Sequence, residues 1–486
     1  MKSYLKFLGM FLLMMVCTLH AQDFNDALRL SDPGIISGPR SLGMGNAYTA
    51  ISNDLSAAIF NPAGFGLIRK LQFDGALGNN SLSNNVTFFG NSTNASNSST
   101  KLSQFGFAFP IPTSRGSLVF ALGYNQLKDY NNVVKFDGYN PGNTSKIQDL
   151  VYSSNPDDND FAYNLGLSYT LRDANNNSLG DTTLINGKLN QSGNILSEGT
   201  INSWYFGGAV EVEQNVFVGA TINIITGTFK RTLDYWEKNL LNNYPSTLQL
   251  DPTDSRTAGF QSFYRNTILN WDISGWDAKI GMLAKVNDSF NLGATIRFPR
   301  TYTIKETYSV YGESNFATTT FKIDPPIDYR SEYNITTPYE FTLGGSFKND
   351  IVTMSADATM IDFTQMQFSS GLDQITREQN NNYIKSLFRT VYNLNAGAEV
   401  RIPNSGFAFR GGFMYKPSPY QGDPTDYDKK YVTVGLGYKT ASNLSLNLAY
   451  SHGWWKDFGD NYGYNVSRTY QDITQDNFVM GVSYNF

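Results

Sequence analysis

Several segments of the chain alternate between apolar side chains on one face and small or polar side chains on the other. At the C-terminus one face carries Phe478, Met480, Val482, Tyr484 and Phe486, with Val479, Gly481, Ser483 and Asn485 between them. The same alternation recurs in residues 290–298, 341–347, 432–438 and 444–451. Successive side chains of a β-strand point to opposite faces, and each segment is close to the roughly 9–11 residues that a tilted transmembrane strand needs. The pattern predicts strands with one face in lipid.

Short turns and long polar stretches connect these segments. The short turns are residues 287–288, 348–350, 403–405 and 441–443, and the long stretches are residues 129–160, 234–271, 362–382, 416–428 and 452–475. Short turns at one end and long loops at the other are typical of outer-membrane barrels, whereas a β-sandwich scatters its loop lengths. From Leu71 onward we count about fourteen candidate strands. The predicted fold is therefore all-β, with a transmembrane antiparallel β-barrel in residues 71–486.

Composition agrees with a membrane barrel. Aromatic residues make up 14% of the chain and charged residues only 16%, below the roughly one quarter of an average soluble domain. After the first residues, no run of about eighteen apolar residues indicates a membrane helix. The net charge of -5 gives no basic patch for nucleic acid, so we expect no nucleic-acid partner.

The N-terminus is typical of a secretory signal peptide. Lys2 and Lys6 precede an apolar stretch from Phe7 to Val16 that is too short to span a bilayer, and Ala21 offers a small residue before a cut. We therefore predict a signal peptide in residues 1–21. The only cysteine, Cys17, follows a valine where lipidation signals need a small residue. The mature chain would then hold no cysteine, and we expect no disulfide, metal or cofactor.

Residues 38–64 read GPRSLGMGNAYTAISNDLSAAIFNPAG, directly before the first predicted strand. This stretch resembles the N-terminal hatch of the FadL/TodX family of outer-membrane transporters. The matching positions are Arg40, Gly43, Gly45, Ala47, Tyr48, Asn53, Asp54, Asn61, Pro62 and Ala63. Residues 337–340, residues 417–419 and the terminal Phe486 also fit the family pattern. The resemblance implies a hatch in residues 22–70 that plugs the lumen.

The hatch sequence also has a physical interpretation of its own. Gly43 and Gly45 allow tight turns close to other backbone segments. Pro62 ends any helix and biases Asn61 to an extended conformation. Residues 52–60 could form one or two helical turns, with Asn53 or Asp54 as the N-cap. With the family pattern, this makes Arg40, Gly43, Gly45, Asn53, Asp54, Asn61, Pro62 and Ala63 the candidate hatch and gating residues.

The resemblance implies passive transport of long-chain fatty acids or other hydrophobic molecules across the outer membrane of a Gram-negative-type bacterium. In the family a ligand arrives among the long loops, occupies an apolar pocket and leaves through a side opening. Cations beside the pocket would bind a carboxylate, and the candidates are Lys230, Arg231, Arg297 and Arg300. Tyr235, Trp236, Tyr244, Phe260, Phe263 and Tyr264 could form a landing groove or a membrane-edge girdle.

Two further expectations concern partners and alternatives. The aromatic terminal residue Phe486 resembles the signal that the barrel-assembly machinery reads, and the barrel would contact outer-membrane lipid. Porin-like relatives from secretion systems share parts of the hatch motif, so the alternative function is a protein-handling scaffold. We expect no enzyme: His452 is the only histidine beyond the signal peptide, and its neighbour Ser451 points to the opposite face of a strand.

Overall fold

The computed structural model describes residues 22–35, 38–441 and 443–486, and the predicted signal peptide lies outside these residues. Its strands form a closed antiparallel barrel of fourteen strands, as the alternation predicts. Four of these strands are interrupted, and each of the four carries two labels joined by "with" below. In order around the wall the strands are β1 (Gln72–Phe88), β2 (Asn91–Ile111), β3 (Leu118–Asp129) with β4 (Asn132–Tyr139), β7 (Asn190–Glu213), β8 (Val216–Lys238), β9 (Ser262–Lys285), β10 (Phe290–Arg297) with β11 (Thr301–Asn315), β13 (Ile327–Thr336) with β14 (Glu340–Lys348), β15 (Val352–Asp362) with β16 (Gln367–Ser370), β17 (Thr390–Arg401), β18 (Phe407–Lys416), β19 (Lys429–Lys439), β20 (Leu444–Asp460) and β21 (Arg468–Asn485).

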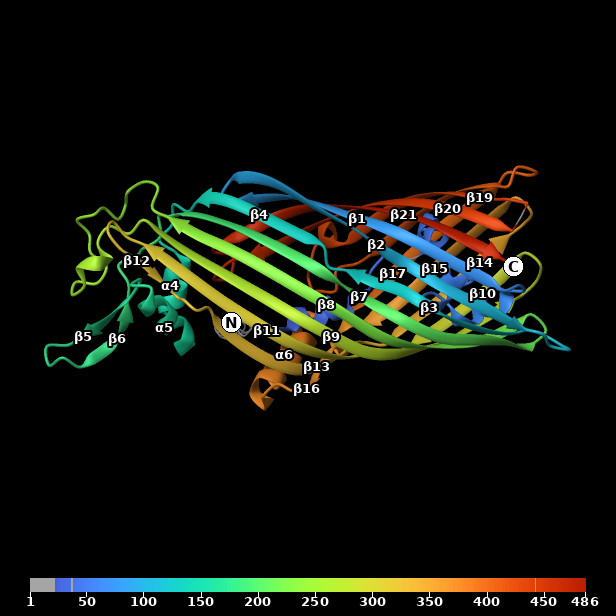
Figure 1. The fold of residues 1–486 in the computed structure, drawn as a ribbon, viewed down its shortest axis with the longest axis horizontal. Helices are drawn as coiled ribbons and strands as arrows, with labels where there is room; N and C mark the ends of the chain where they lie inside the picture. The colour runs from blue at the N-terminus through green and yellow to red at the C-terminus, as the bar shows by residue number, and fades with distance from the viewer. Residues whose placement is uncertain (1–21, 36–37, 442) are drawn as a thin grey trace, which may run out of the picture.

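The two ends of the chain meet in the wall. β21 pairs with β1 in an unbroken antiparallel register from Gln72 opposite Asn485 to Thr87 opposite Tyr470. The C-terminus lies at the end of the barrel with short turns, whereas α4 (Lys146–Val151), α5 (Pro156–Asn164), β5 (Tyr169–Arg172) and β6 (Ser178–Thr182) lie at the opposite end (Figure 1). This asymmetry is the one expected of an outer-membrane barrel, with the long loops outside the cell.

The lipid-facing alternation is confirmed in the terminal strand. Phe478 and Met480 are exposed on the outer face of β21, while Val479 between them is 1% exposed. Beyond the membrane the strands run further than the sequence suggests, because β8 extends to Lys238 and β9 begins at Ser262. Part of the expected loop 234–271 is therefore strand. Above the lipid the outer face no longer needs apolar residues, so the alternation disappears although the hydrogen-bonded ladder continues.

The remaining elements cover the outer end and side of the barrel. They are η3 (Ser255–Thr257), β12 (Thr320–Lys322), η4 (Phe363–Gln365), α6 (Gln374–Leu387) and η5 (Thr425–Tyr427). The hatch lies inside the barrel and consists of α2 (Phe24–Ser31), α3 (Pro39–Gly43), η1 (Leu55–Ala58) and η2 (Pro62–Leu67), drawn in blue in Figure 1. Its last element ends a few residues before β1, which places it where the sequence resemblance expects a plug.

The hatch touches the wall, mostly through its backbone, at a set of glycines, which we call the glycine ring: Gly219, Gly281, Gly293, Gly344, Gly397, Gly412 and Gly435. A Cβ on Gly397 would lie 2.1 Å from the carbonyl oxygen of Met44, and one on Gly412 would lie 2.3 Å from the nitrogen of Gly45. Any larger residue would push the hatch backbone away, since real side chains almost never approach this closely. The glycine ring therefore explains part of the glycine content as a seat for the hatch.

Candidate functional site

Asn61 fastens the hatch to the wall. Its side-chain nitrogen donates to the carbonyl oxygens of Thr49 and Met282, each at 2.9 Å, and its side-chain oxygen accepts from the Ala63 nitrogen at 3.1 Å. Its backbone is extended (φ -150°, ψ 106°), as Pro62 predicts, and Pro62 begins η2. Because Met282 lies on β9, this one side chain joins two hatch segments to the barrel.

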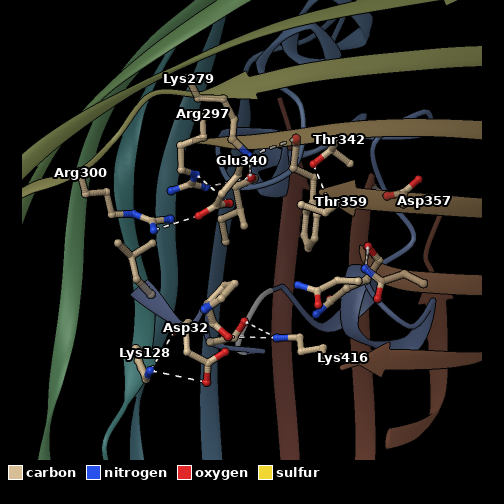
Figure 2. A pocket seen from close by; sticks show the side chains of 18 of the residues that line it. Asp32, Lys128, Lys279, Arg297, Arg300, Glu340, Thr342, Asp357, Thr359 and Lys416 are labelled. Carbon is tan, nitrogen blue, oxygen red and sulfur yellow. Dashed lines mark hydrogen bonds and ion pairs between the residues drawn. The ribbon is translucent and has the colours of Figure 1, made fainter. Parts of the chain in front are cut away.

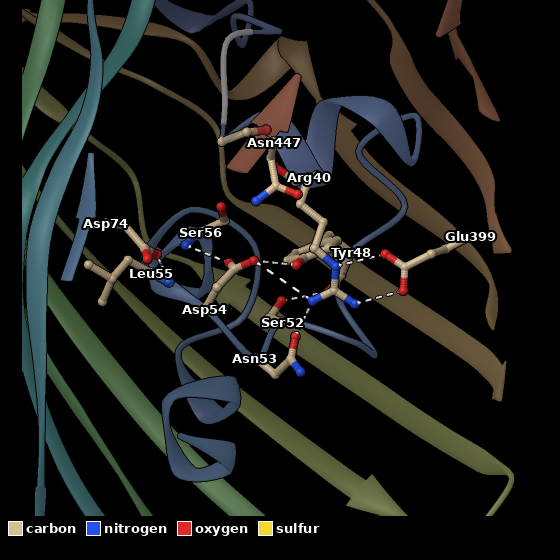
Figure 3. A network of polar contacts seen from close by, with 12 residues as sticks. Arg40, Tyr48, Ser52, Asn53, Asp54, Leu55, Ser56, Asp74, Glu399 and Asn447 are labelled. Atoms are coloured by element: carbon tan, nitrogen blue, oxygen red, sulfur yellow. Dashed lines mark hydrogen bonds and ion pairs between the residues drawn. The ribbon is translucent and has the colours of Figure 1, made fainter. Parts of the chain in front are cut away.

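A buried ionic network holds the other side of the hatch (Figure 3). The Arg40 guanidinium donates to the Glu399 carboxylate at 3.0 Å, and Arg410 donates to the same oxygen at 2.7 Å. Arg40 also donates to Asn53, and it lies 4.0 Å from the Asp54 carboxylate. Glu399, on β17, is only 2% exposed and thus depends on both arginines. The structure thus brings two other predicted hatch residues, Asn53 and Asp54, next to Arg40.

The short helical turn expected in residues 52–60 is η1, and its cap is Asp54. The Asp54 carboxylate accepts from the Ser56 nitrogen at 2.9 Å, as an N-cap does. Asp74 of β1 accepts from the Leu55 nitrogen at 3.0 Å, so η1 is also tied to the wall. Gly45 has a φ of +60°, which confirms the tight turn expected there.

A polar cavity of about 130 Å³ lies between the hatch and the wall (Figure 2). Five cations and three carboxylates line it: Lys128, Lys279, Arg297, Arg300, Lys416, Asp32, Glu340 and Asp357. The cations come from β3, β9, β10, β18 and the link between β10 and β11, so they face the cavity from several sides. We call this space the lysine cavity.

Arg297 and Arg300 are in the lysine cavity, as the sequence suggested, but both already have anionic partners. Asp277 lies 3.1 Å from Arg297 and 3.0 Å from Arg300, and Glu340 lies 3.4 Å and 2.9 Å from them. Two guanidinium groups thus face two carboxylates. The surplus positive charge of the cavity belongs to its lysines, which the sequence analysis did not single out.

The other two predicted cations lie elsewhere. Lys230 is exposed on the outer face of β8, next to the inward-facing and buried Phe229, and so it cannot reach the lumen. Arg231 faces inward but is outside the lysine cavity. A sequence signal for the missed lysines did exist: Lys279 and Lys416 sit on the polar face of alternating segments, where a lysine faces the lumen.

Asp32, at the end of α2, is the anion that balances part of this charge. It lies 2.8 Å from Lys429 and 3.8 Å from Lys128. Burial opposes ionisation of this carboxyl, but Lys429, Lys128 and Lys416 outweigh burial and hold the pKa of Asp32 well below its usual range. Asp32 therefore stays charged at neutral pH and fixes the end of α2.

A packed cluster of buried apolar side chains surrounds α2 and borders the lysine cavity. We call it the aromatic cluster; its buried residues include Tyr130, Ile201, Phe229, Trp271, Tyr302, Tyr333 and Phe388. Ala27 and Leu30 of α2 are 0% and 2% exposed within it. The Arg29 guanidinium stacks over Phe229 at 4.7 Å and Trp271 at 5.2 Å, and it pairs with Asp26.

The aromatic residues expected as a landing groove or girdle form neither. Four of them, Tyr235, Tyr244, Phe260 and Phe263, are buried in a core under the outer loops together with residues of α4 and α5. Trp236 and Tyr264 lie opposite each other on β8 and β9, with ring centroids 5.0 Å apart. Trp236 lies far beyond the lipid-facing Ile224, so it is no membrane-edge residue. The sequence cannot reveal such burial, because the loop packing decides it.

The described residues offer little support for other chemistry. Within them, no group of three or more His, Cys, Asp or Glu residues could hold a metal ion. Among the described helices none is long and apolar enough to cross a membrane. His452 pairs with Asp476 at 2.8 Å on the outer face, while Ser451 is buried on the inner face, as the strand geometry predicts.

Comparisons with known proteins agree with this geometry. The family described as "Outer membrane protein transport protein (OMPP1/FadL/TodX)" matches residues 40–486. A Pseudomonas aeruginosa FadL homologue is similar in structure, with a TM-score of 0.58 and 14% identity over 93% of this chain and 98% of that one. The Pseudomonas putida toluene transporter TodX is also similar, with a TM-score of 0.54 and 14% identity over 93% of this chain and 99% of that one. No curated protein sequence matches. The chain belongs to the OMPP1/FadL/TodX family of outer-membrane transport proteins.

Proposed function

We propose that this chain passively carries amphiphilic acids, long-chain fatty acids above all, across the outer membrane. The observation that carries the proposal is that the aromatic cluster borders the lysine cavity. Leu30, Ile201 and Tyr302 belong to both. An acyl chain that takes the place of α2 in the cluster would thus place its carboxylate among cations. Apolar burial and charge-assisted hydrogen bonds would then stabilise the two ends of one molecule.

The charge balance of the cavity favours an anionic head group. Its lining has five cations against three carboxylates, and Asp277, which contacts Arg297 and Arg300, adds a fourth carboxylate. The Asp357 carboxylate is already hydrogen-bonded to the hatch, because it accepts from the backbone N–H groups of Tyr48 and Thr49 at 2.7 Å and 2.8 Å. A carboxylate would relieve the surplus positive charge, whereas a toluene-like hydrocarbon would gain nothing from it. We therefore place fatty acids ahead of the toluene that TodX is described as transporting.

A sideways exit into the membrane suits an apolar chain better than passage past the hatch. At the level of the hatch the inner wall carries Asp277, Lys279, Asp357, Glu399 and Arg410, all at most 9% exposed. An acyl chain would have to displace these charged groups, which is costly without compensating contacts. The downward route therefore carries a desolvation cost that a route through the wall above the hatch avoids.

A candidate gap lies beside the lysine cavity. The ladder between β2 and β3 stops at Gln104 opposite Asn125, and the strand itself breaks between β3 and β4 at residues 130–131. Leu127 and Lys128, which line the cavity, lie at this break. We propose that the substrate leaves here, with Arg40, Asn53, Asp54 and Asn61 holding the hatch that controls the lower route.

The test is equilibrium binding of radiolabelled hexadecanoate to the purified, detergent-folded protein, with unlabelled fatty acids and toluene as competitors. Saturable binding that fatty acids compete more strongly than toluene supports the proposal. A folded barrel, verified by circular dichroism, that binds no fatty acid would overturn it. The scaffold alternative would then be the better supported function.

A further inference from the structure

An apolar groove of about 700 Å³ indents the outer face of the barrel wall, where β10, β14, β15, β17 and β18 lie side by side. Its floor consists of small residues on the outward face of these strands: Gly345, Ala356, Ala358 and Ala396. Large and exposed side chains border the floor: Leu292, Leu343, Leu394 and Phe413. The volume is within the range of roughly 300–1,000 Å³ that small-molecule pockets have. The outer wall therefore contains a space that its own side chains leave unfilled.

The polar residues next to the groove turn their side chains to the lumen. The Asp357 carboxylate accepts from two backbone N–H groups of the hatch, and the Asn395 side chain donates to the Asn46 carbonyl oxygen at 3.2 Å. Both residues hold the hatch on the inner side of the strands that form the groove. The side chains that face the groove itself are apolar except for Tyr415, which lies towards the long loops.

Two belts of aromatic side chains place the groove in the hydrocarbon layer of the membrane. On the side of the short turns, Phe290 packs on Phe347 and Phe407 packs on Tyr438, with ring centroids 5.1 Å and 4.7 Å apart. On the side of the long loops, Tyr339 packs between Phe298 and Phe341. Aromatic belts mark the two interfaces of a membrane barrel with water. The floor of the groove lies between the belts, so it meets hydrocarbon.

We propose that this groove binds one acyl chain of a membrane phospholipid. The groove is continuous with the lipid-facing wall around it, so lipid is the component that reaches it in the membrane. Its floor has room for a chain, because even a Cβ on Gly345 would lie 3.8 Å from its nearest neighbour. A chain that follows the floor contacts the bordering side chains as well, and it gains dispersion contacts that a convex surface does not offer. The inference does not depend on what the barrel transports.

The outer face of β7, β8 and β9 has the opposite shape and provides a comparison. Large side chains project from it and are 54–66% exposed: Trp204, Phe206, Ile222, Ile224 and Trp276. We call this surface the outer ridge. Lipid touches the ridge too, but a chain there lies against projecting side chains and gains fewer contacts than it does in the groove.

The experiment is photo-cross-linking of the full mature protein in phosphatidylethanolamine vesicles that contain a phosphatidylcholine with a diazirine in one acyl chain. Mass spectrometry maps the labelled peptides. We expect lipid-facing positions in residues 343–358 and 394–413 to be labelled about tenfold more than those of the outer ridge, the ratio that roughly 1.4 kcal/mol of additional binding gives. Equal labelling of the two surfaces overturns the inference.

A variant with a filled groove provides the second arm. Ala358→Leu combined with Ala396→Leu adds side chains of the kind that face lipid elsewhere on the wall, and heat-modifiable migration verifies that the barrel has folded. Labelling of the groove should then fall to the level of the outer ridge. Ala220→Leu, on the outer face of β8, is the matched control and should leave labelling of the groove unchanged. Unchanged labelling in the folded double variant overturns the inference, and so do cross-links of the groove to a second copy of this chain in place of lipid.

Discussion

The side-chain oxygen of Asn61 lies so close to Gly281 that a Cβ on this glycine would be only 2.0 Å from it. The hatch asparagine therefore fits only against a wall residue without a side chain. Neighbouring glycines do the same for other hatch segments: a Cβ on Gly293 would lie 2.5 Å from the Thr49 carbonyl. The wall and the hatch are complementary at the level of the backbone.

Gly281→Ala should displace the hatch without disrupting the barrel. The added methyl group meets Asn61 and the Pro62 ring, so the hydrogen bonds of Asn61 to Thr49 and Met282 must break. We expect hatch docking to weaken by about 2 kcal/mol, as for other overpacked sites, and ion conductance in planar bilayers to rise. Gly345→Ala is the control, because its Cβ would lie 3.8 Å from its nearest neighbour. Equal conductance of the two variants would refute the role of the glycine ring as a seat for the hatch.

Glu399→Gln should loosen the other side of the hatch. The substitution leaves Arg40 and Arg410 buried side by side without their shared carboxylate. Removing one partner of a buried ion pair costs about 3 kcal/mol or more. We expect higher proteolysis of the hatch in native detergent micelles. Arg401→Gln is a suitable comparison, since Arg401 is 39% exposed and also contacts Glu399; its effect should be small.

The C-terminal residue gives a prediction about assembly. The backbone N–H of Phe486 donates to the Leu71 carbonyl oxygen at 2.9 Å. The Phe486 ring packs on the Tyr484 ring, with the ring centroids 4.8 Å apart. If the barrel-assembly machinery reads this aromatic end, Phe486→Ala should lower the amount of folded barrel in the outer membrane, measured by heat-modifiable migration. The same variant should refold normally in detergent. Poor refolding in detergent would instead indicate a structural role.

The sequence predicted the wall and the hatch because each rests on local patterns. Alternation marks lipid-facing strands such as β21, and the turn at Gly45 and the extended Asn61 follow from glycine and proline chemistry. The loops were less predictable. Tyr244 and Phe260 are buried by contacts with α4 and α5, which no local pattern encodes.

The candidate site was only half predictable for the same reason. Arg297 and Arg300 were found because they lie at a strand end, but their neutralisation by Asp277 and Glu340 depends on three neighbouring strands. Lys128 and Lys416 lie on strands far apart in the sequence and meet only through the hatch. Single-sequence reasoning can place a lysine on the inner face, but it cannot tell which inner-face lysines converge.

The boundary between the aromatic cluster and the lysine cavity should set chain-length selectivity. Ile201 is 1% exposed and belongs both to the cluster and to the cavity lining, so Ile201→Phe would overpack the boundary between them. A long acid with its carboxylate in the cavity must extend past this boundary into the cluster, whereas a short acid need enter little of the cluster. We expect Ile201→Phe to weaken hexadecanoate binding about tenfold, within the range for overpacked sites, and to leave octanoate binding nearly unchanged. Isothermal titration of both acids measures the difference, with Ile201→Val as the control. Equal losses for the two acids would mean that the tail and the head group do not bind on opposite sides of Ile201.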